Sequence, residues 1–100
     1  MPILEVTGAG RIGRGRWSFR PLCRLTLYDE FLVAAVRAQR TLVHYADIES
    51  VALEDRKKVK VIRILGPIKD GRPTPDIHFA PKDPEATEAA LKEQLTNARG

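Results

Sequence analysis

The sequence has little cysteine, few aromatic residues and no long apolar segment. Its single cysteine, Cys23, excludes an intramolecular disulfide framework and is typical of a reducing compartment. The longest mostly apolar stretch, FLVAAV at Phe31–Val36, is far too short to span a bilayer. The N-terminal MPILEVTG lacks the basic region and apolar run of a signal peptide. Together these absences predict a cytoplasmic protein.

The charge of the chain is unevenly distributed. Its 100 residues, 43% hydrophobic and 30% charged, predict one globular domain over residues 1–100. Five arginines and no acidic residue lie between Thr7 and Asp29, and a second basic run follows Glu54 and Asp55. Such clusters are either a footprint for phosphate groups or a solvated surface that favours solubility. The two runs consist of Arg11, Arg14, Arg16, Arg20 and Arg24, and of Arg56, Lys57, Lys58 and Lys60.

The segment GAGRIGRGRW at Gly8–Trp17 contains G-x-G-x-x-G, the phosphate-binding pattern of dinucleotide enzymes. That function requires a helix that begins at the glycines and crosses over to a parallel strand. Gly15 and Pro21 oppose such a helix, and the segment between Gly13 and Cys23 is too short for a crossover. We therefore expect a flexible basic loop whose glycines allow positive φ values in a hairpin or bulge.

Alternating apolar and polar residues predict about six or seven strands joined by short turns, among them turns at Asp29–Glu30 and Gln39–Arg40. The β-branched KVKVIRIL at Lys58–Leu65 is the clearest strand. Its partner is IHFA at Ile77–Ala80, across a long loop at Gly66–Asp76 that contains two glycines and three prolines. Short connections make neighbouring strands antiparallel, so the sheet closes into a barrel or folds into a sandwich.

One helix is expected at the C-terminal end of the chain. Asp83 is placed to cap it, and Pro84 suits its first turn. Leu91 and Leu95 lie four residues apart on one face, and residues 98–100 are expected to fray. The predicted fold class is therefore mainly β with one C-terminal α-helix that covers an open end or edge.

Side chains suited to catalysis or metal binding are few and widely spaced. Cys23, Ser18 and Ser50 are the candidate nucleophiles, and His44 and His78 are the candidate bases or metal ligands. Because no motif pairs them, we expect no enzyme activity, no bound metal and no cofactor. Cys23 is interpreted as a small packed residue.

Two aromatic residues, Trp17 and Phe19, come directly after the basic loop. Trp17 and Phe19 have the side chains that stack on bases or insert at a membrane interface. Because they lie two residues apart on one face of a strand, the simpler interpretation places both in the core. The chain has no RNA-recognition or helix-turn-helix pattern, so no specific nucleic-acid partner is expected.

Several segments resemble the pleckstrin-homology-like (PH-like) superfold, in particular its small bacterial and GRAM-type members. These segments are CRLTLYDEFLVAA, TLVHYADIESVAL, VKVIRI, IHFA and the C-terminal helix. In that family x-D-I-x-x-V marks the bend between two sheets, and here this element is Tyr45, Asp47, Ile48 and Val51. The resemblance covers residues 3–96. It implies a bent antiparallel β-barrel of about seven strands, capped at one open end by the helix.

The resemblance also implies two binding functions. Many members are noncatalytic modules for protein–protein interaction or self-association, which is the first hypothesis. In lipid-binding members, basic residues of the loop between the first two strands hold phosphoinositide phosphates. The second hypothesis is therefore binding of anionic membrane lipid or a phosphorylated ligand, and a small hydrolase or transferase that uses Cys23 or a histidine is the third. The residues that the second hypothesis assigns are Arg11, Arg14, Arg16, Lys57 and Lys58, with Lys60 as a further cation.

Overall fold

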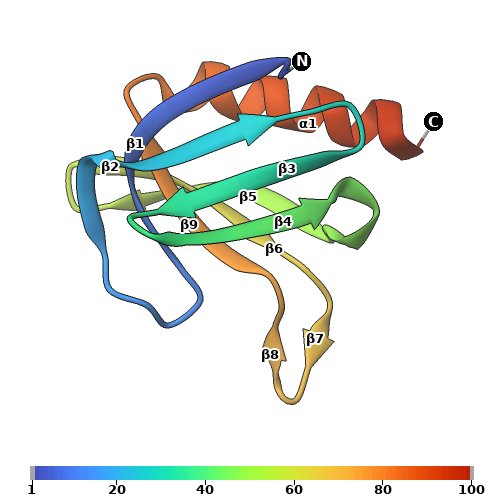
Figure 1. Ribbon diagram of the computed structural model, residues 1–100, viewed down its shortest axis with the longest axis horizontal. Coiled ribbons are helices and arrows are strands. Elements are labelled where there is room, and N and C mark those ends of the chain that lie inside the picture. Colours follow the sequence, from blue (N-terminus) through green and yellow to red (C-terminus); the bar gives the residue numbers. More distant parts are fainter. Residues whose placement is uncertain (1, 100) are drawn as a thin grey trace.

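Seven strands form one curled antiparallel sheet in the computed structural model, which describes residues 2–99 (Figure 1). The order of strands across the sheet is β4-β3-β2-β1-β9-β6-β5, and β7 and β8 form a separate small hairpin. The predicted class, mainly β with one C-terminal helix, is confirmed. The elements are β1 (Leu4–Ile12), β2 (Ser18–Leu27), β3 (Phe31–Val36), β4 (Gln39–His44), the 3-10 helix η1 (Tyr45–Asp47), β5 (Ser50–Arg56), β6 (Val59–Leu65), β7 (Ile68–Lys69), β8 (Arg72–Pro73), β9 (Asp76–Pro81) and α1 (Pro84–Arg99).

Strand β1 joins the two halves of the sheet. Its first half pairs with β2, from Leu4 opposite Leu27 to Gly8 opposite Cys23, and its second half pairs with β9. The sheet curls around this strand into a half-barrel, and α1 lies across one end of it (Figure 1). Among the described residues, β4 and β5 each pair with a strand on one side only, and η1 connects them.

Alternation along the strands directs one face of the sheet into a single core. Residues 23, 25 and 27 of β2 are buried, while residues 22 and 24 are exposed. Leu91 and Leu95 of α1 close the core, and Tyr45 of η1 is fully buried with its hydroxyl donating to the Tyr28 carbonyl at 2.6 Å. Each large apolar side chain buried in this way contributes about 1.5–3 kcal/mol.

The glycine-rich segment differs from the expected loop, because β1 continues through Gly8 and Gly10. A Cβ atom at Gly10 would overlap the carbonyl oxygen of His78, and one at Gly8 would lie 2.5 Å from that of Ala80. These two glycines therefore allow β1 and β9 to approach closely. Of the three glycines in the motif, only Gly13 adopts a positive φ, of 59°. The expected bulge is present, as a shift of register between Gly8 and Gly10 in the pairing of β1 with β2.

Of the two tight turns predicted from the sequence, one forms where it was expected. The turn at Asp29–Glu30 is confirmed, with the Tyr28 amide donating to the Phe31 carbonyl at 2.8 Å. The turn expected at Gln39–Arg40 is wrong, because β4 begins at Gln39 and the turn comprises residues 37–38. That two-residue connection contains none of the Gly, Asn or Asp residues that usually mark such a turn. The loop at Gly66–Asp76 carries the β7–β8 hairpin, which projects from the body of the protein (Figure 1).

The C-terminal helix begins as predicted. The Asp83 side chain accepts a hydrogen bond from the Ala86 amide at 3.1 Å, which confirms the helix cap. The expected fraying is wrong for residues 98 and 99, which continue the helix, and Gly100 lies outside the described residues. Within residues 2–99, no helix combines the length and the apolar character needed to cross a membrane.

Candidate functional site

The basic residues predicted to bind an anion are distributed over three cavities. Arg11 lines a cavity of about 280 Å³, Arg14 lines one of about 410 Å³, and Lys57 lines one of about 290 Å³. Arg16 and Lys58 are exposed and line none of these three. The five side chains therefore do not converge on one concave site.

The Lys57 cavity lies in a surface that we call the aromatic-basic patch. It combines side chains from the start of β2 with side chains from the β5–β6 hairpin. Phe19 is 72% exposed and Val59 is 50% exposed. The guanidinium carbon of Arg56 lies 5.1 Å from the centroid of the Trp17 ring, within the range of a cation–π interaction. The patch consists of Trp17, Phe19, Arg56, Lys57, Val59 and Val61.

The interpretation of Trp17 and Phe19 as core residues is wrong. Ser18 pairs with Gly10, whereas Cys23 pairs with Gly8, so residues 19–22 of β2 stand opposite the single residue Ala9. Residues 19–22 therefore loop out of the regular pairing, and all four are exposed. This bulge turns the Phe19 ring toward solvent, while Trp17 remains half-buried.

The Arg14 cavity lies between the β1–β2 loop and the base of the β7–β8 hairpin. Arg14 and Arg72 line it from these two elements, and within residues 2–99 Asp76 is its one acidic lining residue. The Gly13 amide donates to the Asp76 carbonyl at 2.7 Å, which holds the loop against the start of β9. Two guanidinium groups thus border one opening of about 410 Å³.

Arg11 belongs to a different electrostatic environment. It is the cross-strand neighbour of His78, whose Nε2 atom lies 3.2 Å from Asp76 Oδ1. Arg63 Nε donates to the same carboxylate oxygen at 3.3 Å. Burial lowers the pKa of His78; Asp76 opposes this shift and Arg11 adds to it. Because its cavity is also lined by Glu54 and Asp55, Arg11 lies among compensating charges.

The candidate nucleophiles and bases lie in separate places. Cys23 is 1% exposed, its thiol donates to the Gly10 carbonyl at 3.5 Å, and burial raises its pKa, so the interpretation as a packed residue is confirmed. The Ser18 hydroxyl is also buried and accepts a hydrogen bond from Arg37 at 3.0 Å. His44 instead packs its ring edge against Phe31 on β3, with centroids 6.0 Å apart. Ser50 begins β5 opposite Leu65, and His78 belongs to the Arg11 environment.

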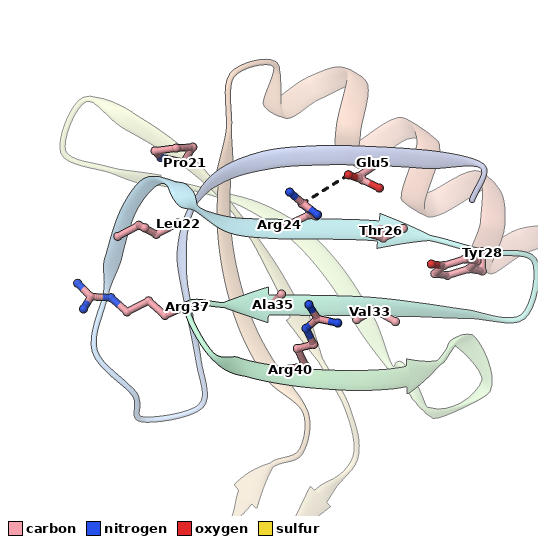
Figure 2. Close-up of a pocket in the computed structure, with 10 residues that line it drawn as sticks. All are labelled: Glu5, Pro21, Leu22, Arg24, Thr26, Tyr28, Val33, Ala35, Arg37 and Arg40. Atoms are coloured by element: carbon pink, nitrogen blue, oxygen red, sulfur yellow. Dashed lines mark ion pairs between the residues drawn. The ribbon is translucent and has the colours of Figure 1, made fainter. Parts of the chain in front are cut away.

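A further basic surface, which the sequence interpretation missed, covers the solvent side of β1 to β4. We call it the outer sheet face. Arg24, Arg37 and Arg40 line an open cavity of about 330 Å³ on this face. In Figure 2 the side chains of Arg24 and Arg40 lie over the strands, whereas that of Arg37 points away from them. Polar or charged residues at alternate positions of β2 were the available signal, because they indicate the face that points away from the core.

The chain was compared with known proteins by sequence. No protein-family model matches it, and no curated protein matches it.

Proposed function

We propose that the protein is a noncatalytic PH-like binding module that engages a protein partner, or a second copy of itself, through the aromatic-basic patch. The observation that carries this proposal is the exposure of Phe19, at 72%, beside Trp17 and Val59. Clustered apolar side chains exposed on a folded domain mark interaction sites, and Trp and Arg are enriched among the residues that dominate binding energy. Arg56 and Lys57 add charge at the border of the apolar surface.

The PH-like assignment is supported by the arrangement of the elements. A curled antiparallel sheet of seven strands is followed by one C-terminal helix at its end. The bend element expected at Tyr45, Asp47, Ile48 and Val51 begins with η1, and both Tyr45 and the following Ile48 are buried at 1% exposure or less. The proposal that the module is noncatalytic is supported by Cys23 and Ser18, because both side chains are packed and hydrogen-bonded. We place the module in the cytoplasm because its one cysteine forms no intramolecular disulfide.

The proposal is tested by photo-crosslinking from the patch. The photoreactive residue p-benzoylphenylalanine replaces Phe19 in one variant and Ile68 in a control variant. Ile68 is a suitable control because it is 74% exposed but lies on the β7–β8 hairpin. We expect the probe at position 19, and not at position 68, to crosslink one discrete protein or a second copy of the chain in cells. Adducts of lipid alone, or the same products from both positions, would contradict the proposal.

A second candidate function is binding of a phosphorylated ligand or anionic lipid headgroup at the Arg14 cavity. It is favoured because Arg14 and Arg72 come from separate elements and line one opening. Guanidinium groups suit phosphate oxygens by geometry and charge. We expect the protein to co-sediment with phosphatidylinositol-phosphate vesicles at low salt. The double variant Arg14→Ala plus Arg72→Ala is expected to lose this binding. Lys57→Ala plus Lys58→Ala is the matched control, and equal loss in both pairs would indicate nonspecific attraction.

A further inference from the structure

The outer sheet face has a regular arrangement that follows from strand register. Arg24 pairs with Ala35, and Ala35 pairs with Arg40, so two arginines flank a small residue across three strands. In the next row Thr26 pairs with Val33, and Val33 with Leu42. One row across the face is therefore basic, and the next combines Thr26 with two apolar side chains.

The charge of this face is mostly uncompensated. Among residues 2–99, Glu5 is the one acidic residue that lines its cavity, and its Oε1 atom lies 3.5 Å from Arg24 Nε. The dashed line in Figure 2 marks this ion pair. Arg37 reaches sideways and donates to the Ser18 hydroxyl at 3.0 Å. Arg40 stands on β4 toward the same open cavity, and the side chain is exposed (Figure 2).

The apolar row ends at a free edge of the sheet. Leu42 on β4 is 52% exposed, and among residues 2–99 no strand pairs with β4 on the side away from β3. Beyond this row, the rings of Tyr28 and Phe31 stack with centroids 4.8 Å apart. An unpaired edge strand offers backbone donors and acceptors to an incoming extended segment, and its exposed side chains then select the sequence of that segment.

We propose that the free edge of β4 and the outer sheet face bind an extended acidic segment of a partner protein. The segment adds a strand beside residues 39–44, with a carboxylate facing Arg40 and an apolar side chain against Leu42, which lies two residues further along the same face. Charge complementarity favours this occupant, because three arginines line the cavity with one glutamate. A second copy of this chain would bring Arg40 toward like charge across the same edge.

A discrete segment also fits this face better than a membrane does. Glu5 lies within the face, and Asp29 and Glu30 lie in the turn that follows β2. A flat anionic bilayer would contact these carboxylates together with the arginines, whereas a narrow peptide avoids them. The inference is separate from the proposed function, because the cavity of this face shares no lining residue with the aromatic-basic patch.

The test is an NMR titration with the eight-residue peptide Glu-Ser-Val-Ser-Glu-Ser-Val-Ser, which as a strand presents glutamate and valine in turn on one face. We expect amide shifts confined to β3, β4 and the end of β2, and a weaker affinity as salt rises. Arg40→Glu is expected to weaken binding at least tenfold. Arg56→Glu, which reverses another exposed arginine, in the aromatic-basic patch, is expected to change it less than twofold. The same peptide with glutamine in place of glutamate is expected not to bind.

Several results would overturn the inference. These are an absence of shifts at millimolar peptide, shifts centred on α1 or the β5–β6 hairpin, and equal losses in Arg40→Glu and Arg56→Glu. Binding to phosphatidylserine vesicles that Arg40→Glu abolishes would assign the face to a membrane instead. A dimer that Arg40→Glu dissociates would assign it to self-association.

Arg40→Gln, which adds no repulsion, serves as the second variant if Arg40→Glu fails to fold. Phe19→Ser is expected to leave peptide binding intact whether or not the proposed function holds.

Discussion

Replacing Gly10 by alanine tests the close approach of β1 and β9 that joins the two halves of the sheet. The added Cβ atom would overlap the His78 carbonyl oxygen and would lie 3.1 Å from the carbonyl carbon and 3.2 Å from the Phe79 Cα atom. All three atoms belong to the backbone of β9, so no side-chain rotation relieves the overlap. The two strands must separate, and with them the cross-strand pairs that flank this position.

The expected cost is at the upper end of the range for overpacking, about 3 kcal/mol or more. For a domain of this size each 1 kcal/mol lowers the melting temperature by roughly 4–8 °C, so a decrease of about 12–24 °C is expected. Gly13→Asn is the control, because a Cβ atom there meets nothing within 4 Å and asparagine tolerates its positive φ of 59°. That variant is expected to lose less than about 1 kcal/mol.

The assay is thermal and denaturant unfolding of both variants, followed by circular dichroism. A Gly10→Ala protein as stable as the wild type would refute the close-approach explanation. The same conclusion would follow if Gly13→Asn were the more destabilised of the two, because the motif would then depend on loop conformation and not on strand spacing.

Two further predictions concern buried polar groups. Tyr45→Phe removes the hydrogen bond to the Tyr28 carbonyl and is expected to lower the free energy of unfolding by about 1 kcal/mol, whereas Tyr28→Phe should leave it nearly unchanged in the same denaturant titration. Burial holds the pKa of His78 in the folded protein below its ordinary value of 6.5. As the pH decreases from above 6.5, His78 is therefore protonated in the unfolded chain first, and the free energy of unfolding should fall until the pH has passed the folded pKa. His78→Gln should lack this component, and a stability difference between wild type and His78→Gln that stays constant from pH 7.5 to 5 would contradict it.

Much of the fold is predictable because its signals are local. Alternation at Lys58–Leu65 and the cap at Asp83 each concern a few consecutive residues, and both elements formed where they were expected. The role of Gly10 was not predictable in this way. It depends on a carbonyl group of β9, nearly seventy residues further along the chain, and a glycine motif read alone indicates a loop.

The candidate site was harder to predict because it depends on register. Trp17 and Phe19 have the spacing of a buried strand face, and only the offset pairing of β1 with β2 shows that residues 19–22 loop out. The fold separates the basic residues of the first run, because β1 directs Arg11 toward β9 while Arg14 lies at the base of the hairpin. Arginines that are close in sequence therefore belong to different cavities.

The central claim, that the aromatic-basic patch is the binding surface, is tested most directly by the affinity of two matched variants. Phe19→Ser and Ile68→Ser each remove one highly exposed apolar side chain, the first inside the patch and the second outside it. We expect Phe19→Ser to weaken binding to the crosslinked partner, or self-association measured by light scattering, by about 2 kcal/mol, or roughly thirtyfold. Ile68→Ser should change it less than twofold. Equal affinities in both variants and the wild type would contradict the claim.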